Sequence, residues 1–383
     1  IEAVAATGGT ILPPVMGVVA FVMAQNLGVP YKEVALAALI PAILYYVCLF
    51  IQVDLHAAQN GAGKLSKDEL PPLALIRKRG WLLAPIFFTL IYLLFVKGYP
   101  PATAGLYTSG VALVCLLLQK WIWPEVLSRL IVTLIESGKT LLEIGIVLCA
   151  AGLMVGIISI TGLGFNLVLA LTQFGQQGLF VLLVACAIVC IILGMGMPAI
   201  AAYSIVALLI APSLVELSVT PMAAHMFVLF FANVSNFTPP IALASFAAAP
   251  IAQESPYKIS VQAMKLGIVS YVIPFVFVYN PSLLLSTNLE TEIVDYMLSI
   301  VGPVFACIVL PIGLVGYLFR PLGPVKRILM IVLAFVLFWP LENQNIKLLM
   351  NGMALIVFAV LFLVEWKKNR QKGLARTNVN HVA

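Results

Sequence analysis

The sequence has 383 residues, of which 62% are hydrophobic and 9% are charged, with a formal net charge of +6. Soluble domains are roughly 45–50% apolar and about 25% charged. A water-exposed surface on a chain of this size needs far more charged groups, so the composition excludes a soluble globular protein and predicts one integral membrane unit. The basic residues are spread between apolar blocks, which argues against a nucleic-acid partner.

Apolar segments long enough to cross a bilayer recur along almost the whole chain. The predicted fold class is therefore all-α, a polytopic integral membrane protein. The chain starts at Ile1 without the pattern of a signal peptide, and we expect an N-terminal part of the protein to be missing. The predicted membrane segments are residues 11–27, 33–53, 81–97, 102–120, 140–160, 179–215, 221–251, 263–285, 298–318, 325–341 and 346–364.

Lys and Arg are expected on the cytoplasmic side of each membrane segment. Starting from the basic C-terminal tail and alternating sides places all 21 Lys and Arg inside except Lys32, Lys97 and Lys347. This distribution requires residues 179–215 to enter and leave on the same side, as a re-entrant hairpin. Residues 221–251 must then cross once, with an unwound break in the middle.

Two membrane segments contain polar residues followed by a double proline. Residues 9–21, GTILPPVMGVVAF, resemble residues 235–247, SNFTPPIALASFA, and the predicted topology gives the two copies opposite orientations. Non-helical backbone at membrane depth survives only inside protein or beside a cavity. Inverted repeats with broken helices are typical of secondary transporters, which bind their substrate between the breaks.

The chemistry of the breaks follows from their backbone. The double prolines are expected to begin half-helices, with Thr238 as the N-cap of the second one. A half-helix N-terminus carries partial positive charge and free N–H groups, which suits a carboxylate. Carbonyl groups freed at the ends of the incoming half-helices offer oxygen ligands for sodium. Further oxygen ligands are expected from the side chains of Thr7, Thr10, Ser235 and Asn236.

These motifs resemble the large membrane (DctM-like) subunit of tripartite ATP-independent periplasmic (TRAP) transporters. The residues that carry the resemblance are Gly194–Pro198, Ala202-Tyr203, Ala224-His225, Ser235–Pro240 and Pro274–Pro281. The opening Thr7–Gly17 and the extended C-terminus are similar to fused permeases, in which the small and large membrane subunits form one polypeptide. The resemblance covers residues 1–285 and lacks the small-subunit region and the first hairpin, which we expect upstream.

The resemblance implies an elevator-type sodium symporter for an organic acid, such as a C4-dicarboxylate, in a bacterial or archaeal cytoplasmic (inner) membrane, with a cytoplasmic C-terminus. The implied partners are an extracytoplasmic solute-binding protein, the organic acid, sodium, membrane lipid and a small membrane subunit fused upstream. Sodium would be the coupling ion, and no other cofactor is expected. The alternative is a sodium- or proton-coupled organic anion carrier that works without a binding protein.

Candidate site residues follow from the breaks and from the resemblance. The expected substrate-binding residues are Thr10, Pro13, Gly196, Pro198, Thr238 and Pro239. The expected sodium-binding residues are Thr7, Gly8, Gly9, Gly194, Asn233, Ser235 and Asn236. Gly194 and Gly196 could instead allow close helix packing, and the side chains of Asn233, Ser235, Asn236 and Thr238 could form interhelical hydrogen bonds. His225 is either a packing residue or a substrate or proton group.

Other classes of protein fit the sequence less well. With three His, no HExxH motif and no clustered Asp, the chain lacks the residues of a membrane-embedded enzyme, so no catalytic residue and no metal site other than sodium is expected. An ion channel would show a repeated pore segment with a filter. A scaffold subunit would not need inverted broken helices.

The predicted organisation has five parts. Residues 1–53 are the end of the first inverted repeat, and residues 54–139 are a cytoplasmic loop with connecting scaffold spans. Residues 140–285 are the second repeat, with the hairpin 179–215 and the broken helix 221–251. Residues 286–364 are a C-terminal extension of three spans plus an outer loop, and residues 365–383 are a basic cytoplasmic tail.

Overall fold

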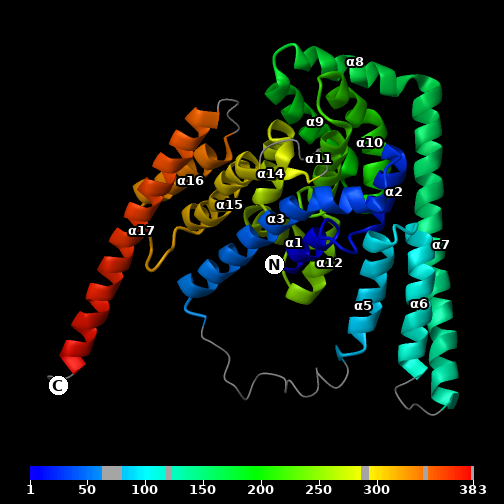
Figure 1. The fold of residues 1–383 in the computed structure, drawn as a ribbon, viewed down its shortest axis with the longest axis horizontal. Helices are drawn as coiled ribbons and strands as arrows, with labels where there is room; N and C mark the ends of the chain where they lie inside the picture. Colours follow the sequence, from blue (N-terminus) through cyan, green and yellow to red (C-terminus); the bar gives the residue numbers. More distant parts are fainter. Residues whose placement is uncertain (63–79, 118–122, 286–292, 340–343, 381–383) are drawn as a thin grey trace. The chain divides into compact units, whose positions relative to one another are not determined.

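The computed structural model describes residues 1–62, 80–117, 123–285, 293–339 and 344–380. Within these ranges the regular structure is helical, and the one β feature is an isolated bridge between Tyr317 and Pro321. The predicted all-α class is therefore confirmed, and Figure 1 gives the order of the helices. The charged loops 63–79 and 286–292, which contributed to the predicted topology, lie outside the described residues.

Several helices have the length and composition of membrane spans. Among the described residues four qualify, namely Tyr31–Gln59, Ala199–Glu216, Pro256–Tyr279 and Ile346–Gln371. A further pair, Leu148–Ile158 with Leu163–Gly175, qualifies together but is bent by 73°. Most of the other predicted segments correspond to shorter apolar helices of 10–17 residues. These helices support a polytopic membrane protein.

The chain folds into two compact units, each built from segments that are distant in the sequence. Unit 1 takes its residues from Ile1–Leu12, Ala37–Gly63 and Asn233–Ala383. In this unit α1 packs on α12 and α13, and α15, α16 and α17 pack on one another. Its helices are α1 (Glu2–Gly9), most of α3 (Tyr31–Gln59), α12 (Leu243–Ala252), α13 (Pro256–Leu266), α14 (Val269–Tyr279), the 3-10 turn η2 (Pro281–Leu283), α15 (Ile293–Val315), α16 (Pro324–Phe338) and α17 (Gln344–Asn380).

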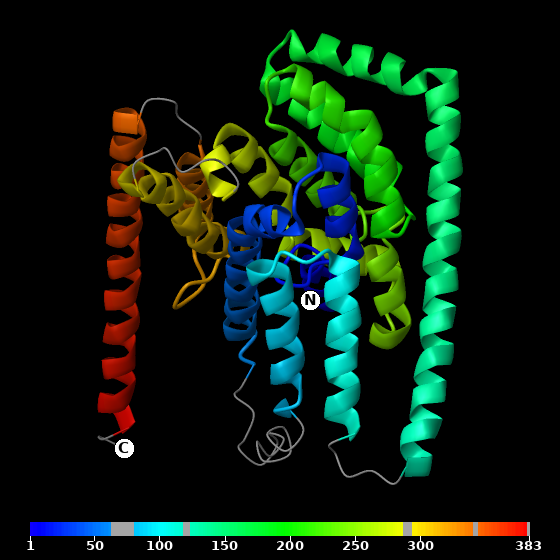
Figure 2. The same cartoon turned by 45° about the vertical axis from the view of Figure 1, so that its right-hand side comes forward.

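Unit 2 takes its residues from Pro13–Leu36 and Lys64–Ala232. Helices α8, α9 and α10 pack on one another, and α2 packs on α10. Figure 2 shows α7 as one long helix that turns sharply into α8 at Gly162, whose φ of +67° favours glycine. The helices of unit 2 are α2 (Val18–Leu27), the start of α3, α5 (Leu83–Ile91), the π-helical turn η1 (Tyr92–Val96), α6 (Pro101–Leu117), α7 (Trp123–Thr161), α8 (Leu163–Gly175), α9 (Leu179–Gly194), α10 (Ala199–Glu216) and all but the last two residues of α11 (Pro221–Val234).

The structure contains both predicted breaks, but the helices after them begin later than expected. The first break lies between α1 and α2, and the second lies between α11 and α12. The expectation that the double prolines begin half-helices is wrong, because α2 begins at Val18 and α12 at Leu243. A residue that precedes proline is disfavoured in the helical conformation, so the first proline of each pair is kept out of a helix.

The predicted hairpin corresponds to α9 and α10, which pack against each other. The turn between them contains Gly196, whose φ is +72°. Only glycine adopts this left-handed conformation at little cost, so the turn itself accounts for a glycine here. Gly194, at the end of α9, is buried.

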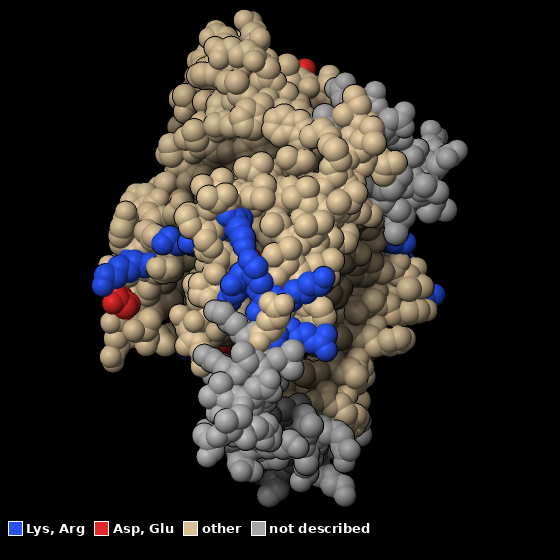
Figure 3. All heavy atoms as spheres, turned by 90° about the vertical axis from the view of Figure 1, so that its left-hand side faces the viewer, with Lys and Arg blue, Asp and Glu red and all other residues tan. Residues whose placement is uncertain are grey.

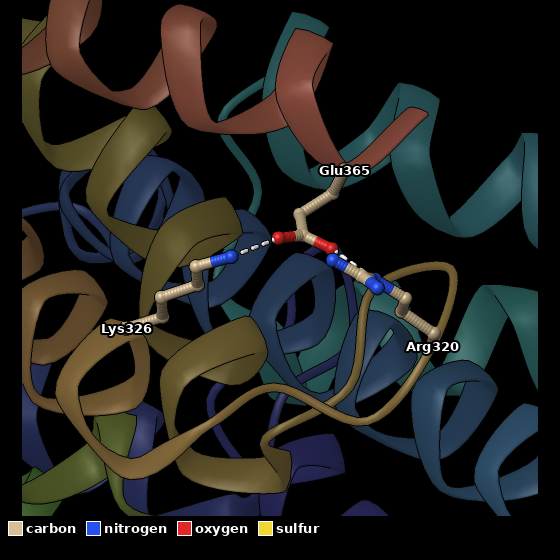
Figure 4. Close-up of polar contacts among 3 residues, drawn as sticks. All are labelled: Arg320, Lys326 and Glu365. Atoms are coloured by element: carbon tan, nitrogen blue, oxygen red, sulfur yellow. Dashed lines mark hydrogen bonds and ion pairs between the residues drawn. The ribbon is translucent and has the colours of Figure 1, made fainter. Parts of the chain in front are cut away.

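An ion cluster joins the C-terminal helices of unit 1. The carboxylate of Glu365 on α17 is 2% exposed and accepts hydrogen bonds from Arg320 and Lys326 (Figure 4). The hydrogen bond with Glu365 raises the pKa of Arg320. Arg327 donates to the carbonyl oxygens of Gly313 and Leu314, at 3.2 and 2.8 Å, and so pairs carbonyls in the last turn of α15. Charged side chains therefore stabilise the ends of three apolar helices.

Replacing Glu365 with Gln is expected to lower the free energy of unfolding by about 1–2 kcal/mol, because a buried cluster loses its anion. The loss stays below the larger values for fully buried pairs since Arg320 and Lys326 remain about a third exposed. Thermal unfolding of the purified protein in detergent measures this loss. The matched control is Glu136→Gln, which removes an exposed ion pair with Lys139 and should change stability little. Equal shifts in the two variants would contradict the prediction.

Candidate functional site

The inverted repeat extends further than the two double-proline motifs. Pro13-Pro14 and Pro239-Pro240 are separated by 226 residues, and the same spacing relates Pro30-Tyr31-Lys32 to Pro256-Tyr257-Lys258. The two helical patterns also correspond, since α2 and α3 match α12 and α13 to within one residue at their starts. Each break contains a cis Pro–Pro peptide bond. Both copies therefore consist of an incoming helix, a break, a short helix and a long apolar segment.

In unit 1 two tyrosines of α3 hold α1. The hydroxyl of Tyr45 donates to the carbonyl oxygen of Val4 at 2.6 Å, and that of Tyr46 donates to Ala5 at 2.8 Å. A Cβ atom on Gly8 would clash with the ring of Tyr45. The contact gives Gly8 a packing role that the sequence did not indicate, whereas the exposed Gly9 has room for a side chain.

Thr7 and Thr10, both predicted ligands, lie at the end of α1. Thr7 is 9% exposed and its hydroxyl donates to the carbonyl of Ala3, while Thr10 donates to the carbonyl of Thr7, each at 2.7 Å. A hydroxyl that donates its proton keeps its oxygen lone pairs. Both side chains can therefore still coordinate a cation without breaking these bonds.

At the second break a short chain of hydroxyl groups fixes Thr238. Thr238 donates to the carbonyl of Val234 at 2.7 Å, and its oxygen lies 2.6 Å from the hydroxyl of Tyr271. Since a carbonyl can only accept, the single proton of Thr238 points to Val234, and Tyr271 must donate to Thr238. Thr238 thus pairs a carbonyl at the end of α11 and does not cap α12, contrary to our expectation; the N-cap is Ala242.

The surroundings of Thr238 are closely packed. The rings of Phe237 and Tyr271 meet edge to face, with centroids 6.2 Å apart. Gly267 accommodates Phe237, because a Cβ atom there would lie 2.9 Å from its ring. The backbone is also paired across the break, where the N–H of Ala244 donates to the carbonyl of Asn236 at 2.9 Å. The second break is not helical, but these contacts hold its backbone in place.

Ser245 on α12 has a buried hydroxyl without a hydrogen-bond partner among the described residues, and Asn233 has a whole side-chain amide in that state. Asn233 is 4% exposed, and neither its amide oxygen nor its amide nitrogen has a hydrogen-bond partner among the described residues. Burying an unpaired amide costs roughly 1–3 kcal/mol on protein scales. Native proteins seldom retain such a group without a ligand, ion or water that completes it. Asn233 is therefore a buried polar group at the end of α11 whose hydrogen-bonding capacity is unused among the described residues.

The predicted site residues divide between the two units. Unit 1 contains Thr7, Gly8, Gly9, Thr10, Asn233, Ser235, Asn236, Thr238 and Pro239, and unit 2 contains Pro13, Gly194, Gly196 and Pro198. Ser235 is fully buried, whereas Asn236 and Pro239 are half-buried. In unit 2 Pro13 is half-buried, and Gly196 and Pro198 are exposed in the turn before α10.

In unit 2 a tyrosine holds the first break. The hydroxyl of Tyr31, at the start of α3, lies within hydrogen-bond distance of the carbonyl oxygens of Pro14 and Val15, at 2.9 and 3.0 Å. Its ring packs on Phe21 with centroids 4.5 Å apart. Tyr257, at the equivalent position of the second repeat, is 66% exposed. The two breaks are therefore held by different tyrosines.

His225 forms a polar pair in unit 2. The hydroxyl of Tyr203, which is fully buried, lies 2.7 Å from Nδ1 of His225, and Tyr203 also interacts with the side chain of Asn26. The residues Tyr203 and His225 both belong to motifs that carried the family resemblance. The structure brings them together. Nδ1 of His225 has a hydrogen-bond partner in Tyr203, as the packing interpretation expects.

A cavity of about 750 Å³ lies elsewhere in unit 1, among α1, α12 and α13. Half of the residues that line it are alanine, and none of them is a predicted site residue. Glu254 and Lys258 line it and form an exposed ion pair at 3.1 Å. The backbone N–H of Ser255, helped by Lys258, holds the pKa of Glu254 below its usual value. The cavity and the breaks are thus separate features.

Sequence reasoning missed the tyrosines that order the breaks. Tyr45 and Tyr271 are related by the same spacing as the double prolines, so extending the repeat along α3 would have identified them. Their individual partners, however, differ between the copies. Those partners depend on tertiary contacts that a repeat cannot specify.

Comparison with protein families gives a match over more than half of the chain. The family described as "Tripartite ATP-independent periplasmic transporter, DctM component" matches residues 1–291. The matched range includes both breaks and the hairpin, and it ends before α15. No curated protein matches the chain.

Replacing Thr238 with Val is expected to lower the free energy of unfolding by about 1–2 kcal/mol, because the carbonyl of Val234 and the hydroxyl of Tyr271 both lose their partner. Thr238→Ser should keep most of the stability. Thermal unfolding of Thr238→Val, Tyr271→Phe and the double variant tests whether the two hydroxyls act as one chain. The losses should then be less than additive. Strictly additive losses would contradict the inferred bond.

Proposed function

The chain belongs to the DctM component family of tripartite ATP-independent periplasmic transporters, and we propose that it moves an organic acid across the membrane together with sodium. Family membership makes it a multi-pass membrane permease that works with a solute-binding protein and a small membrane subunit. Sodium coupling, the organic acid and the site residues are our proposal, as is a cytoplasmic C-terminus in an inner membrane.

The observation that carries the sodium proposal is the unpaired amide of Asn233. Its oxygen is a hard ligand of the type that sodium accepts, and it lies one turn or less from Ser235 and Asn236. Coordination of a sodium ion by this oxygen would remove the free-energy cost of burying the oxygen unpaired. We include Asn233, Ser235, Asn236, Thr7, Gly8, Gly9 and Gly194 in the sodium-binding set, with Gly8 also required for packing.

Charge explains how sodium and an organic acid would depend on each other. Neither break, residues 10–17 or 235–242, contains a charged side chain. A sodium ion bound there would be an uncompensated charge in a low-dielectric region, which is unfavourable. A carboxylate nearby neutralises that charge, so each ion favours the binding of the other. This mutual requirement is what a symporter needs.

The short helices after the breaks suit the carboxylate. Neither α2 nor α12 has a side-chain cap at its N-terminus. The N–H groups of Ala20 in α2 and Ala244 in α12 are paired with backbone carbonyls, and the other N–H groups of the first turns have no capping side chain. Such N–H groups, with the helix dipole, favour an anion. Our proposed substrate-binding residues are Thr10, Pro13, Gly196, Pro198, Thr238 and Pro239. Recognition through backbone groups accepts many carboxylates, including C4-dicarboxylates.

Replacing Asn233 with Leu, which has a similar size, should abolish the stabilisation by sodium without destabilising the sodium-free protein. Removing an unpaired buried amide is expected to leave stability unchanged or to raise it by about 1 kcal/mol. Sodium that binds the folded state raises its stability by mass action, so the parent should gain about 1.4 kcal/mol at roughly tenfold its Kd. The measurement is thermal unfolding in sodium chloride compared with choline chloride.

A suitable control is Ser213→Ala on α10, because Ser213 is also fully buried and its hydroxyl has no partner among the described residues. This variant should keep the sodium response. Sodium stabilisation that persists in Asn233→Leu would remove Asn233 from the proposed site.

The function itself is tested by uptake into liposomes. The product of the whole gene is reconstituted with its binding protein, and uptake of labelled organic acids is measured with and without an inward sodium gradient. We expect uptake that needs both the gradient and the binding protein. Sodium-driven uptake without the binding protein would favour the independent carrier instead, and uptake that ignores the gradient would contradict sodium coupling.

A further inference from the structure

The three C-terminal helices lie beyond the family match, and two of them, α16 and α17, have exposed apolar faces. The apolar stretch of α17 is long enough to cross a membrane, yet only 17% of its residues are buried. Its exposed side chains include Ile356, Val360 and Leu363, and those of α16 include Val332 and Phe335. These faces are suited to lipid chains, because their area is apolar and spans most of a helix.

Basic residues gather where α15 ends, α16 begins and α17 leaves its apolar stretch. We call this group the basic end; it consists of Arg320, Lys326, Arg327, Lys367, Lys368 and Arg370. Glu365 is the single acidic residue of the described ranges 316–339 and 344–371, and it is already bound by two of the six cations. The basic end therefore carries a net positive charge. Figure 3 shows Lys and Arg side chains gathered on one face of the molecule.

Some cations of the basic end are held by hydrogen bonds, and others are exposed. Glu365 fixes Arg320 and Lys326, and the carbonyls of α15 fix Arg327. Lys367 and Lys368 are exposed, and the guanidinium of Arg370 lies 5.5 Å from the ring of Trp366. Fixed cations bind an anion with little loss of entropy, and the free ones adapt to it.

An apolar groove begins near the basic end. It has a volume of about 280 Å³ and is lined by Val332, Phe335, Val336, Trp339 and Met350, from α16 and α17. Counted along α16 from Arg327, the groove extends from about 8 to about 18 Å, at 1.5 Å per residue. The nearer part of the groove lies within the hydrocarbon depth of one leaflet, about 15 Å, whereas Met350 on α17 lies 17 residues, about 26 Å, from Lys367. The charge and the nearer part of the groove are thus spaced like the headgroup and the acyl chain of one lipid.

We propose that the basic end binds the phosphate headgroup of an anionic phospholipid, whose acyl chain lies in the groove between α16 and α17. Basic pockets between membrane helices bind such headgroups, and an aromatic residue such as Trp366 suits the interface between headgroup and hydrocarbon. A soluble anion would explain the cations but not the adjoining groove and the exposed apolar faces. The bilayer lipid accounts for all three features.

Quenching of Trp339 by brominated lipids tests the proposal, since Trp339 lines the groove and is 60% exposed. The protein is reconstituted in bilayers of phosphatidylcholine mixed with brominated phosphatidylglycerol or with brominated phosphatidylcholine. The signal of Trp339 is the difference between the parent and Trp339→Phe. We expect stronger quenching by the anionic lipid at equal content, and a preference that falls about fivefold for each exposed lysine removed.

The decisive variant is Lys367→Gln/Lys368→Gln, which removes two exposed charges that have no hydrogen bond or ion pair with the described residues. Its matched control is Lys32→Gln/Lys97→Gln, which removes two exposed charges from unit 2 and should keep the preference. Equal quenching by the two lipids in the parent, or an unchanged preference in the Lys367→Gln/Lys368→Gln variant, would overturn the proposal. An excess of inorganic phosphate that abolishes the preference would assign the basic end to a soluble anion instead. Unchanged unfolding temperatures show that both variants fold.

Discussion

Backbone that leaves its helical hydrogen bonding inside a membrane needs another partner for every polar group, since lipid supplies none. The protein meets this requirement with hydroxyl groups from other segments of the same unit. Tyr31 pairs carbonyls of the first break, Tyr45 pairs one on the helix before it, and the chain from Tyr271 through Thr238 pairs one at the start of the second break. The amide of Asn233 and the hydroxyl groups of Ser213 and Ser245 are buried without such a partner among the described residues, and the amide of Asn233 is the group on which our sodium proposal rests.

Both breaks lie close to the borders of the two units. The chain passes from one unit to the other between Leu12 and Pro13 and again between Ala232 and Asn233. Unit 1 therefore contains the helix before the first break and the helix after the second, α1 and α12, which pack together. Residues that are more than 200 positions apart thus contribute to one compact body. Such an arrangement needs both repeats, because neither copy alone supplies both helices.

Local signals in the sequence predicted the all-α class, the two breaks and the position of the hairpin. A double proline beside polar residues in an apolar segment is such a signal, because proline and its preceding residue cannot continue a helix. The start of α12 was placed too early since Thr238 pairs backward with Val234, a choice that depends on Tyr271. Likewise, the cluster at Glu365 joins residues 39 and 45 positions apart, and no local pattern predicts that pairing.

The tyrosines of the repeat have a consequence for the history of the chain. If the two copies descend from one duplicated segment, they have since diverged in the hydrogen bonds that hold each break. Inverted repeats are common in transporters. Tyr31 is buried and engaged in the first copy, whereas its counterpart Tyr257 faces outward in the second. Tyr45 and Tyr271 occupy equivalent positions but serve different carbonyl and hydroxyl groups. The two copies are no longer interchangeable. A segment moved from one copy to the other would bring its proline pair without the hydrogen bonds that hold the break around that pair.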